Sequence, residues 1–203
     1  MLDLIPINEK LFLDQCHKKP VRINISLKNC LEDAFYLTLT GRTLVVNNIG
    51  GKLEEDNVSR RSDLSYVLQD IFNLSCEKVK GIYTSNITVF LDNLMASLEN
   101  PYQIDVISVI SRPIHRIKDM TQLDTLYENI FETLVYIVNK YREITSLVFV
   151  PIGCEGFGHD SSMVADLFYK YLYRYSFGNV SNIIISCNGN RDNYNAFECR
   201  KKT

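Results

Sequence analysis

The chain has 203 residues, 46% of them hydrophobic, and a formal net charge of −2 at pH 7, so it can bury a sizeable core. Its basic residues are scattered rather than gathered in one segment, so direct DNA or RNA binding is not expected. No secretory leader is evident and no apolar run reaches the roughly 18 residues of a membrane span, which predicts a soluble intracellular protein, cytoplasmic or nuclear, with no membrane partner.

Buried strands and amphipathic helices alternate along the chain. Strands are predicted at 21–25, 43–48, 81–91, 104–110, 146–150 and 182–186, and helices at 27–39, 60–72, 124–142 and 161–175. Continuous apolar strands interleaved with helices predict a three-layer α/β fold, with a mixed, mainly parallel sheet flanked by helices. No Gly/Ser/Pro-rich linker divides the pattern, so residues 1–203 are predicted to form a single domain, with 1–20 as an N-terminal extension and 199–203 as a tail.

The six cysteines and three histidines lack the close spacing of metal sites, so thiols, mostly buried, are predicted, with no metal and no cofactor. Cys154 and His159 could form a nucleophile and base, but no third residue that would orient them is identifiable, and a structural role is preferred. A stripe of large apolar residues at helical spacing is predicted to pack in the core. It comprises Phe168, Tyr169, Leu172, Tyr173 and Tyr175.

Asparagine and glycine gather where the predicted strands end. The residues are Asn47, Asn48, Gly50, Gly51, Asn188 and Gly189. In an open α/β sheet the ligand crevice lies beyond the carboxyl ends of the strands. Side-chain amides there can bind ribose hydroxyls, and backbone N–H groups can bind phosphate. The alternative is that these residues mark ordinary turns.

The stretch PIGCEGFGHD (151–160) joins the strand at 146–150 to the helix at 161–175 and holds three of the nine glycines. Glycine lets backbone amides approach a phosphate closely, and the following helix start adds a partial positive charge. A tight connector with nothing bound is the alternative. The stretch is therefore a candidate phosphate-binding turn.

This region carries a family resemblance. VFVPIGCEGFGHDSSMVADLFYKYL resembles the signature near the end of macro domains, most closely that of the microbial-type poly(ADP-ribose) glycohydrolase branch. TLVVNNIGG resembles the strand and loop that hold the distal ribose in that branch, and EEDNVSRRSDL resembles its acidic segment followed by Arg-Arg-Ser. Two central strands match in order, so the resemblance spans roughly residues 27–198.

The resemblance implies a single macro-like domain that binds ADP-ribose, free or on a modified protein or polymer, and acts as an ADP-ribosyl glycohydrolase. The distal ribose would lie against residues 47–51. The implied residues of the pyrophosphate loop are Gly153, Cys154, Gly156, Phe157 and Gly158. Phe157 would also stack near a ribose.

The same resemblance places the chemistry in the acidic segment. Cleavage of the ribose glycosidic bond needs a carboxylic acid to protonate the leaving oxygen and an activated water. Asp56 falls on the position of the catalytic acid, one methylene shorter than the glutamate of the family, and Glu55 is the alternative acid. A solvated acidic first turn of the following helix is the structural alternative for this segment.

Two departures from the family pattern keep a second function open. The loop NNIGGKLEED is shorter than the family's three-glycine loop, and Glu155 stands where family phosphate loops have glycine. A carboxylate facing a pyrophosphate would repel it by about 1 kcal/mol or more at close range. The alternative is a non-catalytic module that reads or sequesters ADP-ribose or a related nucleotide.

Overall fold

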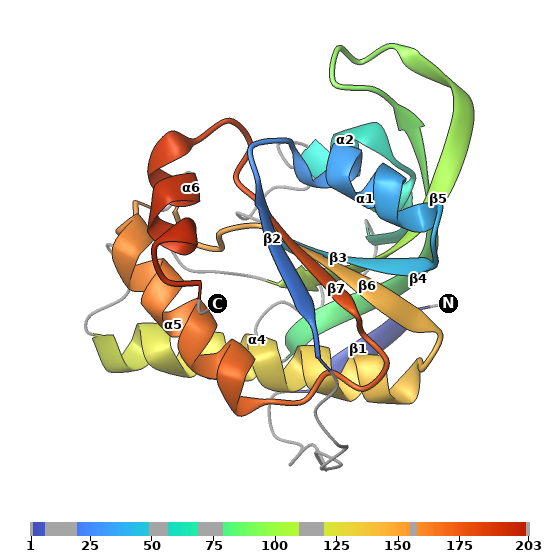
Figure 1. The fold of residues 1–203 in the computed structure, drawn as a ribbon. Coiled ribbons are helices and arrows are strands. Elements are labelled where there is room, and N and C mark those ends of the chain that lie inside the picture. The colour runs from blue at the N-terminus through green and yellow to red at the C-terminus, as the bar shows by residue number, and fades with distance from the viewer. Residues whose placement is uncertain are drawn as a thin grey trace.

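The computed structural model describes residues 2–6, 20–48, 57–68, 79–109, 120–154 and 158–201. These residues build a seven-stranded sheet in the order β1-β4-β5-β3-β6-β7-β2 (Figure 1). The strands are β1 (Leu2–Pro6), β2 (Arg22–Ser26), β3 (Arg42–Asn48), β4 (Val79–Leu91), β5 (Ser97–Val109), β6 (Ile144–Phe149) and β7 (Asn182–Ser186). The helices are α1 (Cys30–Thr38), α2 (Asn57–Arg61), α4 (Met120–Lys140), α5 (Ser161–Arg174) and α6 (Arg191–Glu198).

Most of the sheet is parallel. Strands β5, β3, β6, β7 and β2 pair in parallel, whereas β4 pairs antiparallel with β5, and the edge strand β1 pairs antiparallel with β4. Successive parallel strands of one sheet need crossover connections, and α1, α4 and α5 lie in the crossovers from β2 to β3, from β5 to β6 and from β6 to β7. The predicted mixed, mainly parallel sheet flanked by helices is therefore confirmed.

The side chains of β3 divide the core into two layers. Val45 faces a cluster that includes Leu31 and Ala34 of α1. Its neighbours Leu44 and Val46 belong to the cluster formed with α4 and α5. Successive residues of a strand point to opposite faces, so the continuous apolar run of β3 requires cover on both sides. Figure 1 shows α1 and α2 on one face of the sheet and α4 and α5 on the other.

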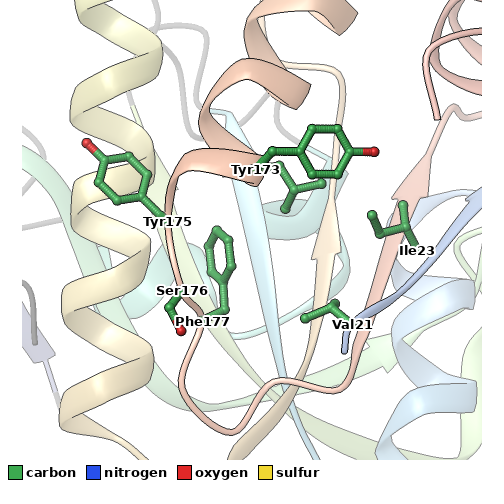
Figure 2. Close-up of a pocket in the computed structure, with 7 residues that line it drawn as sticks. Val21, Ile23, Tyr173, Tyr175, Ser176 and Phe177 are labelled. Atoms are coloured by element: carbon green, nitrogen blue, oxygen red, sulfur yellow. The ribbon is translucent and has the colours of Figure 1, made fainter. Parts of the chain in front are cut away.

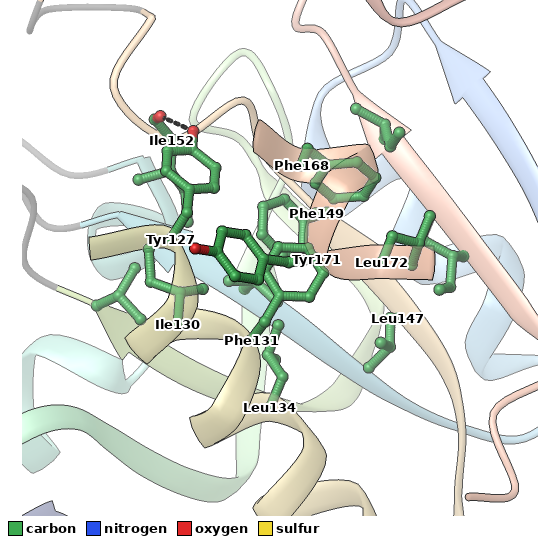
Figure 3. Close-up of a cluster of buried hydrophobic side chains, with 14 of the residues drawn as sticks. Tyr127, Ile130, Phe131, Leu134, Leu147, Phe149, Ile152, Phe168, Tyr171 and Leu172 are labelled. Atoms are coloured by element: carbon green, nitrogen blue, oxygen red, sulfur yellow. Dashed lines mark hydrogen bonds between the residues drawn. The ribbon is translucent and has the colours of Figure 1, made fainter. Parts of the chain in front are cut away.

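Aromatic rings fill the layer between the sheet and helices α4 and α5 (Figure 3). Phe168 of α5 meets Phe149 edge-to-face at 4.8 Å between ring centroids and Phe131 at 5.4 Å. Pairs of this kind contribute about 0.5–1.5 kcal/mol beyond their burial. The predicted core stripe is confirmed, because Phe168, Tyr169 and Leu172 are buried and the two remaining tyrosines pack partly against the cluster.

The predicted helix at 60–72 is wrong in its start and its continuity, and its predicted end lies outside the described residues. Helix α2 begins at Asn57 and ends at Arg61, and residues 64–68 are helical again after a break. At the break, Ser62 forms a β-bridge with Val89. The Ser62 hydroxyl donates to the carbonyl of Val58 at 2.7 Å and accepts from the N–H of Leu64 at 3.2 Å. Serine thus offers the backbone an alternative to continued helix.

Other elements were missed by the sequence patterns. The strand predicted at 104–110 starts at Ser97, because β4 and β5 form one long antiparallel hairpin. The segment predicted as an N-terminal extension contains β1, which pairs with β4. Helix α6 was not predicted, although the Asn190 side chain caps it by accepting from two backbone N–H groups. Short elements of this kind have too few residues to show a periodicity.

Cys30 and Cys187 are buried, Cys154 is half-buried and Cys199 is exposed, and all four carry thiols. The prediction of thiols is confirmed for these four; Cys16 and Cys76 lie outside the described residues. No helix among the described residues has both the length and the apolar character needed to cross a membrane.

Candidate functional site

The carboxyl ends of three neighbouring strands bring the predicted ligand-binding residues to one edge of the sheet. Val46 of β3 pairs with Phe149 of β6, and Phe149 pairs with Ile185 of β7. The residues that follow therefore lie side by side. They are Asn47 and Asn48 at the end of β3, Gly153, Cys154 and Gly158 after β6, and Asn188 after β7.

The turn after β6 uses glycine where the backbone demands it. Gly153 has φ +98° and Gly158 has φ +75°, both in the region that side chains other than glycine rarely adopt. The N–H of Cys154 donates to the carbonyl of Pro151 at 3.2 Å, and the N–H of His159 donates to the carbonyl of Gly153 at 2.9 Å. The base of the turn is thus closed by its own backbone.

His159 packs beneath this turn. Its residue exposure is 5%, and a Cβ added to Gly153 would lie 2.3 Å from Cδ2 of its imidazole. The ring therefore occupies the space where a side chain at 153 would go. This contact gives His159 a structural role, as preferred from the sequence.

Helix α5 starts directly behind the turn. Its N-cap is Asp160, whose carboxylate accepts from the N–H of Met163 at 2.9 Å. Ser161 donates to the side chain of Asn193 on α6 at 2.6 Å, and Asn193 is fully buried. The unpredicted helix α6 thus fixes the first turn of α5, where the partial positive charge of the helix is strongest.

Tyr127 of α4 holds the other side of the turn. Its hydroxyl donates a hydrogen bond to the carbonyl of Ile152, the residue before Gly153 (Figure 3). Burial raises the pKa of this phenol well above its usual value, so it remains a donor. No motif marked Tyr127 in the sequence, because its partner is distant along the chain and the tyrosine reads as one more apolar position of an amphipathic helix.

The loop after β7 rests on the loop after β2. The N–H groups of Asn188 and Gly189 donate to the carbonyls of Lys28 and Leu27 at 3.1 and 2.7 Å. Asn188 is exposed and has φ +48°, a conformation that asparagine tolerates better than most residues. Its side chain is therefore presented at the carboxyl edge of the sheet by a backbone that these two hydrogen bonds hold against the loop after β2.

A buried carboxylate supports these two loops. Asp33 of α1 accepts hydrogen bonds from the hydroxyls of Ser26 and Ser186, the last residues of β2 and β7. Burial raises the pKa of the Asp33 carboxyl, while the bonds from Ser186 and Ser26 act in the opposite direction. Sequence reasoning missed Asp33, because an aspartate in the first turn of a helix is an ordinary residue there.

Several predicted site residues lie outside the described residues. They are the two candidate acids Glu55 and Asp56, and Gly50, Gly51, Gly156 and Phe157. Helix α2 begins at Asn57, directly after Asp56 in the sequence, and its residues Val58 and Arg61 are buried at 1% and 4% exposure. The chain that follows the acidic segment is therefore anchored in the core.

Two cavities lined by described residues lie elsewhere. One, of about 170 Å³, lies beside the start of β2 and the end of α5, between Ile23, Tyr173 and Phe177 (Figure 2). The other, of about 180 Å³, lies between α1 and the β4–β5 hairpin. In the part of the chain that the structure describes, no group of three or more His, Cys, Asp or Glu side chains is arranged to hold a metal ion.

Comparison with known proteins rests on structure, since no family model and no curated protein matches the sequence. The apo poly(ADP-ribose) glycohydrolase of Deinococcus radiodurans superposes with a TM-score of 0.74 at 18% identity, covering 91% of this chain and 84% of that one. This chain has the fold of bacterial poly(ADP-ribose) glycohydrolases. The glycohydrolase of Thermomonospora curvata, bound to the inhibitor ADP-HPD, gives 0.70 at 19% identity, covering 89% and 79%.

A Deinococcus radiodurans glycohydrolase structure in complex with ADP-ribose gives a TM-score of 0.71 at 18% identity, covering 88% of this chain and 83% of that one. The resemblance that the sequence motifs indicated, to a divergent glycohydrolase-like macro fold, is therefore confirmed at the level of the fold.

Proposed function

We propose that this chain binds ADP-ribose at the carboxyl edge of its sheet and hydrolyses the ribose glycosidic bond of ADP-ribosylated proteins or polymers. The observation that carries the proposal is the turn after β6, where Gly153 and Gly158 adopt positive φ directly before α5. It occurs in a fold shared with glycohydrolases solved with ADP-ribose and with an inhibitor.

Binding would use backbone and amide groups rather than charged side chains. The pyrophosphate would lie on the turn, where N–H groups and the start of α5 favour an anion. Asn47 and Asn188, on the flanking strand ends, would contact the riboses. Tyr127, His159 and Asp33 would act indirectly, because they hold the turn and loops in place.

Catalysis would come from the acidic segment. Asp56, or Glu55, would protonate the leaving oxygen as the bond to the anomeric carbon breaks, and the carboxylate formed would then accept a proton from the attacking water. Position 56 directly precedes helix α2 in the sequence. This mechanism requires no metal ion.

A binding module without turnover is the second candidate function. The shortened loop NNIGGKLEED and the carboxylate of Glu155 within the turn favour it. The shortened loop bears on the placement of the distal ribose relative to the acid, and Glu155 bears on the pyrophosphate, whereas Asn47 and Asn188 at the strand ends are unaffected.

ADP-ribose is expected to raise the melting temperature of the protein. A ligand that binds only the folded state and is present at 100 times its dissociation constant stabilises the fold by about 2.7 kcal/mol. Thermal denaturation with ADP-ribose, and with AMP and ADP for comparison, measures this. An unchanged melting temperature with all three at millimolar concentration would count against both candidate functions.

Replacing Tyr127 with phenylalanine is expected to weaken ADP-ribose binding by about three- to tenfold, because the turn loses its fixed geometry. The carbonyl of Ile152 would also lose its donor, at a cost of about 1–3 kcal/mol of stability. Tyr169→Phe is the matched control, since it too removes a buried bond to a backbone carbonyl, that of Phe197 at 3.0 Å. If calorimetric titration gives the two variants equal affinity for ADP-ribose, Tyr127 has no particular role in shaping the ligand site.

A further inference from the structure

The cavity between α1 and the β4–β5 hairpin has the features of a second ligand site. Its volume is about 180 Å³, and none of its lining residues is among those predicted for ADP-ribose. Sites that enclose drug-sized ligands span roughly 300–1,000 Å³. The cavity can therefore hold one ring system but not a whole dinucleotide.

Three aromatic rings form one side of the cavity. Phe35 meets Tyr102 edge-to-face at 5.2 Å and Tyr36 at 5.6 Å between ring centroids. Phe35 and Tyr36 are nevertheless 38% and 56% exposed, although aromatic rings usually occupy the core. An open aromatic wall of this kind favours a planar partner that can stack on it or meet its edge.

A buried arginine lines the same cavity. Arg61 is only 4% exposed, and its Nε and Nη1 donate to the carbonyl of Leu91 at 3.1 Å and to the side chain of Asn29 at 3.3 Å. Both acceptors are uncharged, and no described contact uses Nη2, the other end of the guanidinium. A buried charged group requires hydrogen-bond partners, so a ligand that offers acceptors would be favoured here.

Acceptors line the cavity as well. One oxygen of Asp92 accepts from the N–H groups of Leu94 and Ala96 at 2.8 and 2.9 Å, and no described contact uses the other. Glu32 also lines the cavity and accepts from the side chain of Asn93. The wall therefore offers donors from Arg61 and acceptors from two carboxylates.

These charges decide which chemistry fits. The lining carries charges of both signs, Arg61 against Glu32 and Asp92, so neither a cationic nor an anionic group matches all of it, and an aliphatic group would offer none of the three a hydrogen bond. A planar, uncharged group with both donors and acceptors on its edge satisfies the lining. Lys28, whose Nζ lies 4.1 Å from the centroid of the Tyr36 ring, adds a cation beside that wall.

We infer that this cavity binds the purine base of a nucleotide. The ring system packs against Phe35 and Tyr36. A ring nitrogen or carbonyl oxygen of the base accepts hydrogen bonds from Arg61, and the exocyclic amine donates to Asp92. Lys28 receives the phosphate outside the cavity. This site is independent of the proposed ADP-ribose site.

The test is titration of the whole chain with AMP and with GMP, without ADP-ribose because its own adenine would compete for the cavity, followed by ligand-observed NMR and calorimetry. One of the purine nucleotides is expected to bind, and comparison of the two shows whether adenine or guanine fits. Tyr36→Ala should weaken that binding about fivefold or more, because base stacking on an aromatic ring is lost. Tyr66→Ala, which removes a ring that is 76% exposed and does not line the cavity, should leave it unchanged.

A second variant, Phe35→Leu, keeps an apolar side chain while removing a ring, and it replaces Tyr36→Ala if that protein does not fold. No saturation by either purine up to about 10 mM overturns the inference. Equal binding of ribose 5-phosphate overturns it too, as does binding that neither ring variant weakens. If ADP-ribose itself fails to bind, only the proposed function falls, because the purine titrations and the ring variants still report on this cavity.

Discussion

Replacing Gly153 with alanine is expected to destabilise the protein by about 2–5 kcal/mol and to weaken ADP-ribose binding at least about tenfold. Two costs add. The backbone at φ +98° is strained for any residue with a Cβ, and that Cβ would lie 2.3 Å from the imidazole of His159. His159 is buried, and its N–H closes the turn, so relieving the clash displaces the backbone that is proposed to bind the pyrophosphate.

The Gly189→Ala variant separates the cost of backbone strain at positive φ from the cost of the clash with His159. Gly189 has φ +78°, but nothing lies within 4 Å of the Cβ that alanine would add. This variant should therefore show only the strain of the backbone, about 1–2 kcal/mol. Denaturant unfolding of both variants measures the difference, and equal losses of stability would show that the contact with His159 contributes nothing.

The double variant Gly153→Ala with His159→Ala tests the contact directly. Without the imidazole the added methyl group has room, so the double variant should be more stable than the sum of the two single losses predicts. Residues in contact commonly show coupling of about 0.5–3 kcal/mol. Strictly additive losses would place the cost of alanine at 153 in the backbone alone.

The elements that the sequence predicted well are those whose burial leaves a local pattern. The strands predicted at 43–48 and 182–186 are observed at Arg42–Asn48 and Asn182–Ser186. Both are internal strands of the sheet covered on two faces, so their middle positions are apolar or small and polar residues stand only at the ends. The glycines at 153 and 158 also indicated the tight turn correctly, since a positive φ restricts the choice of residue to glycine in most cases.

What the sequence could not predict depends on partners that are far away along the chain. The hydroxyl of Tyr127 meets a carbonyl 25 residues later, and Ser186 meets Asp33 across 153 residues. Nothing within a local window distinguishes such a tyrosine or aspartate from its neighbours. The same holds for β1, a five-residue strand whose existence depends on pairing with β4. The residues that support the candidate site were therefore harder to predict than those that would touch the ligand.

Replacing Asp56 with asparagine is expected to lower the rate of ADP-ribose release by about 10²- to 10⁴-fold, the usual contribution of a general acid. Asparagine keeps the size and hydrogen-bonding shape of the side chain but has no proton to give to the leaving oxygen. Binding of ADP-ribose, measured by calorimetry on the same preparation, should change little. The rate is measured on mono- and poly-ADP-ribosylated protein across pH 5 to 8.

The neighbouring carboxylate provides the control. If Glu55 is the acid, Glu55→Gln shows the loss of rate and Asp56→Asn does not, because the shorter side chain reaches about 1.5 Å less far and proton transfer needs heavy atoms near 3 Å apart. Asp56→Glu, which restores the family length, should then leave the rate unchanged, whereas it should raise the rate if position 56 carries the acid. A wild-type protein that binds ADP-ribose yet releases none from either substrate would exclude the hydrolase and leave the binding module.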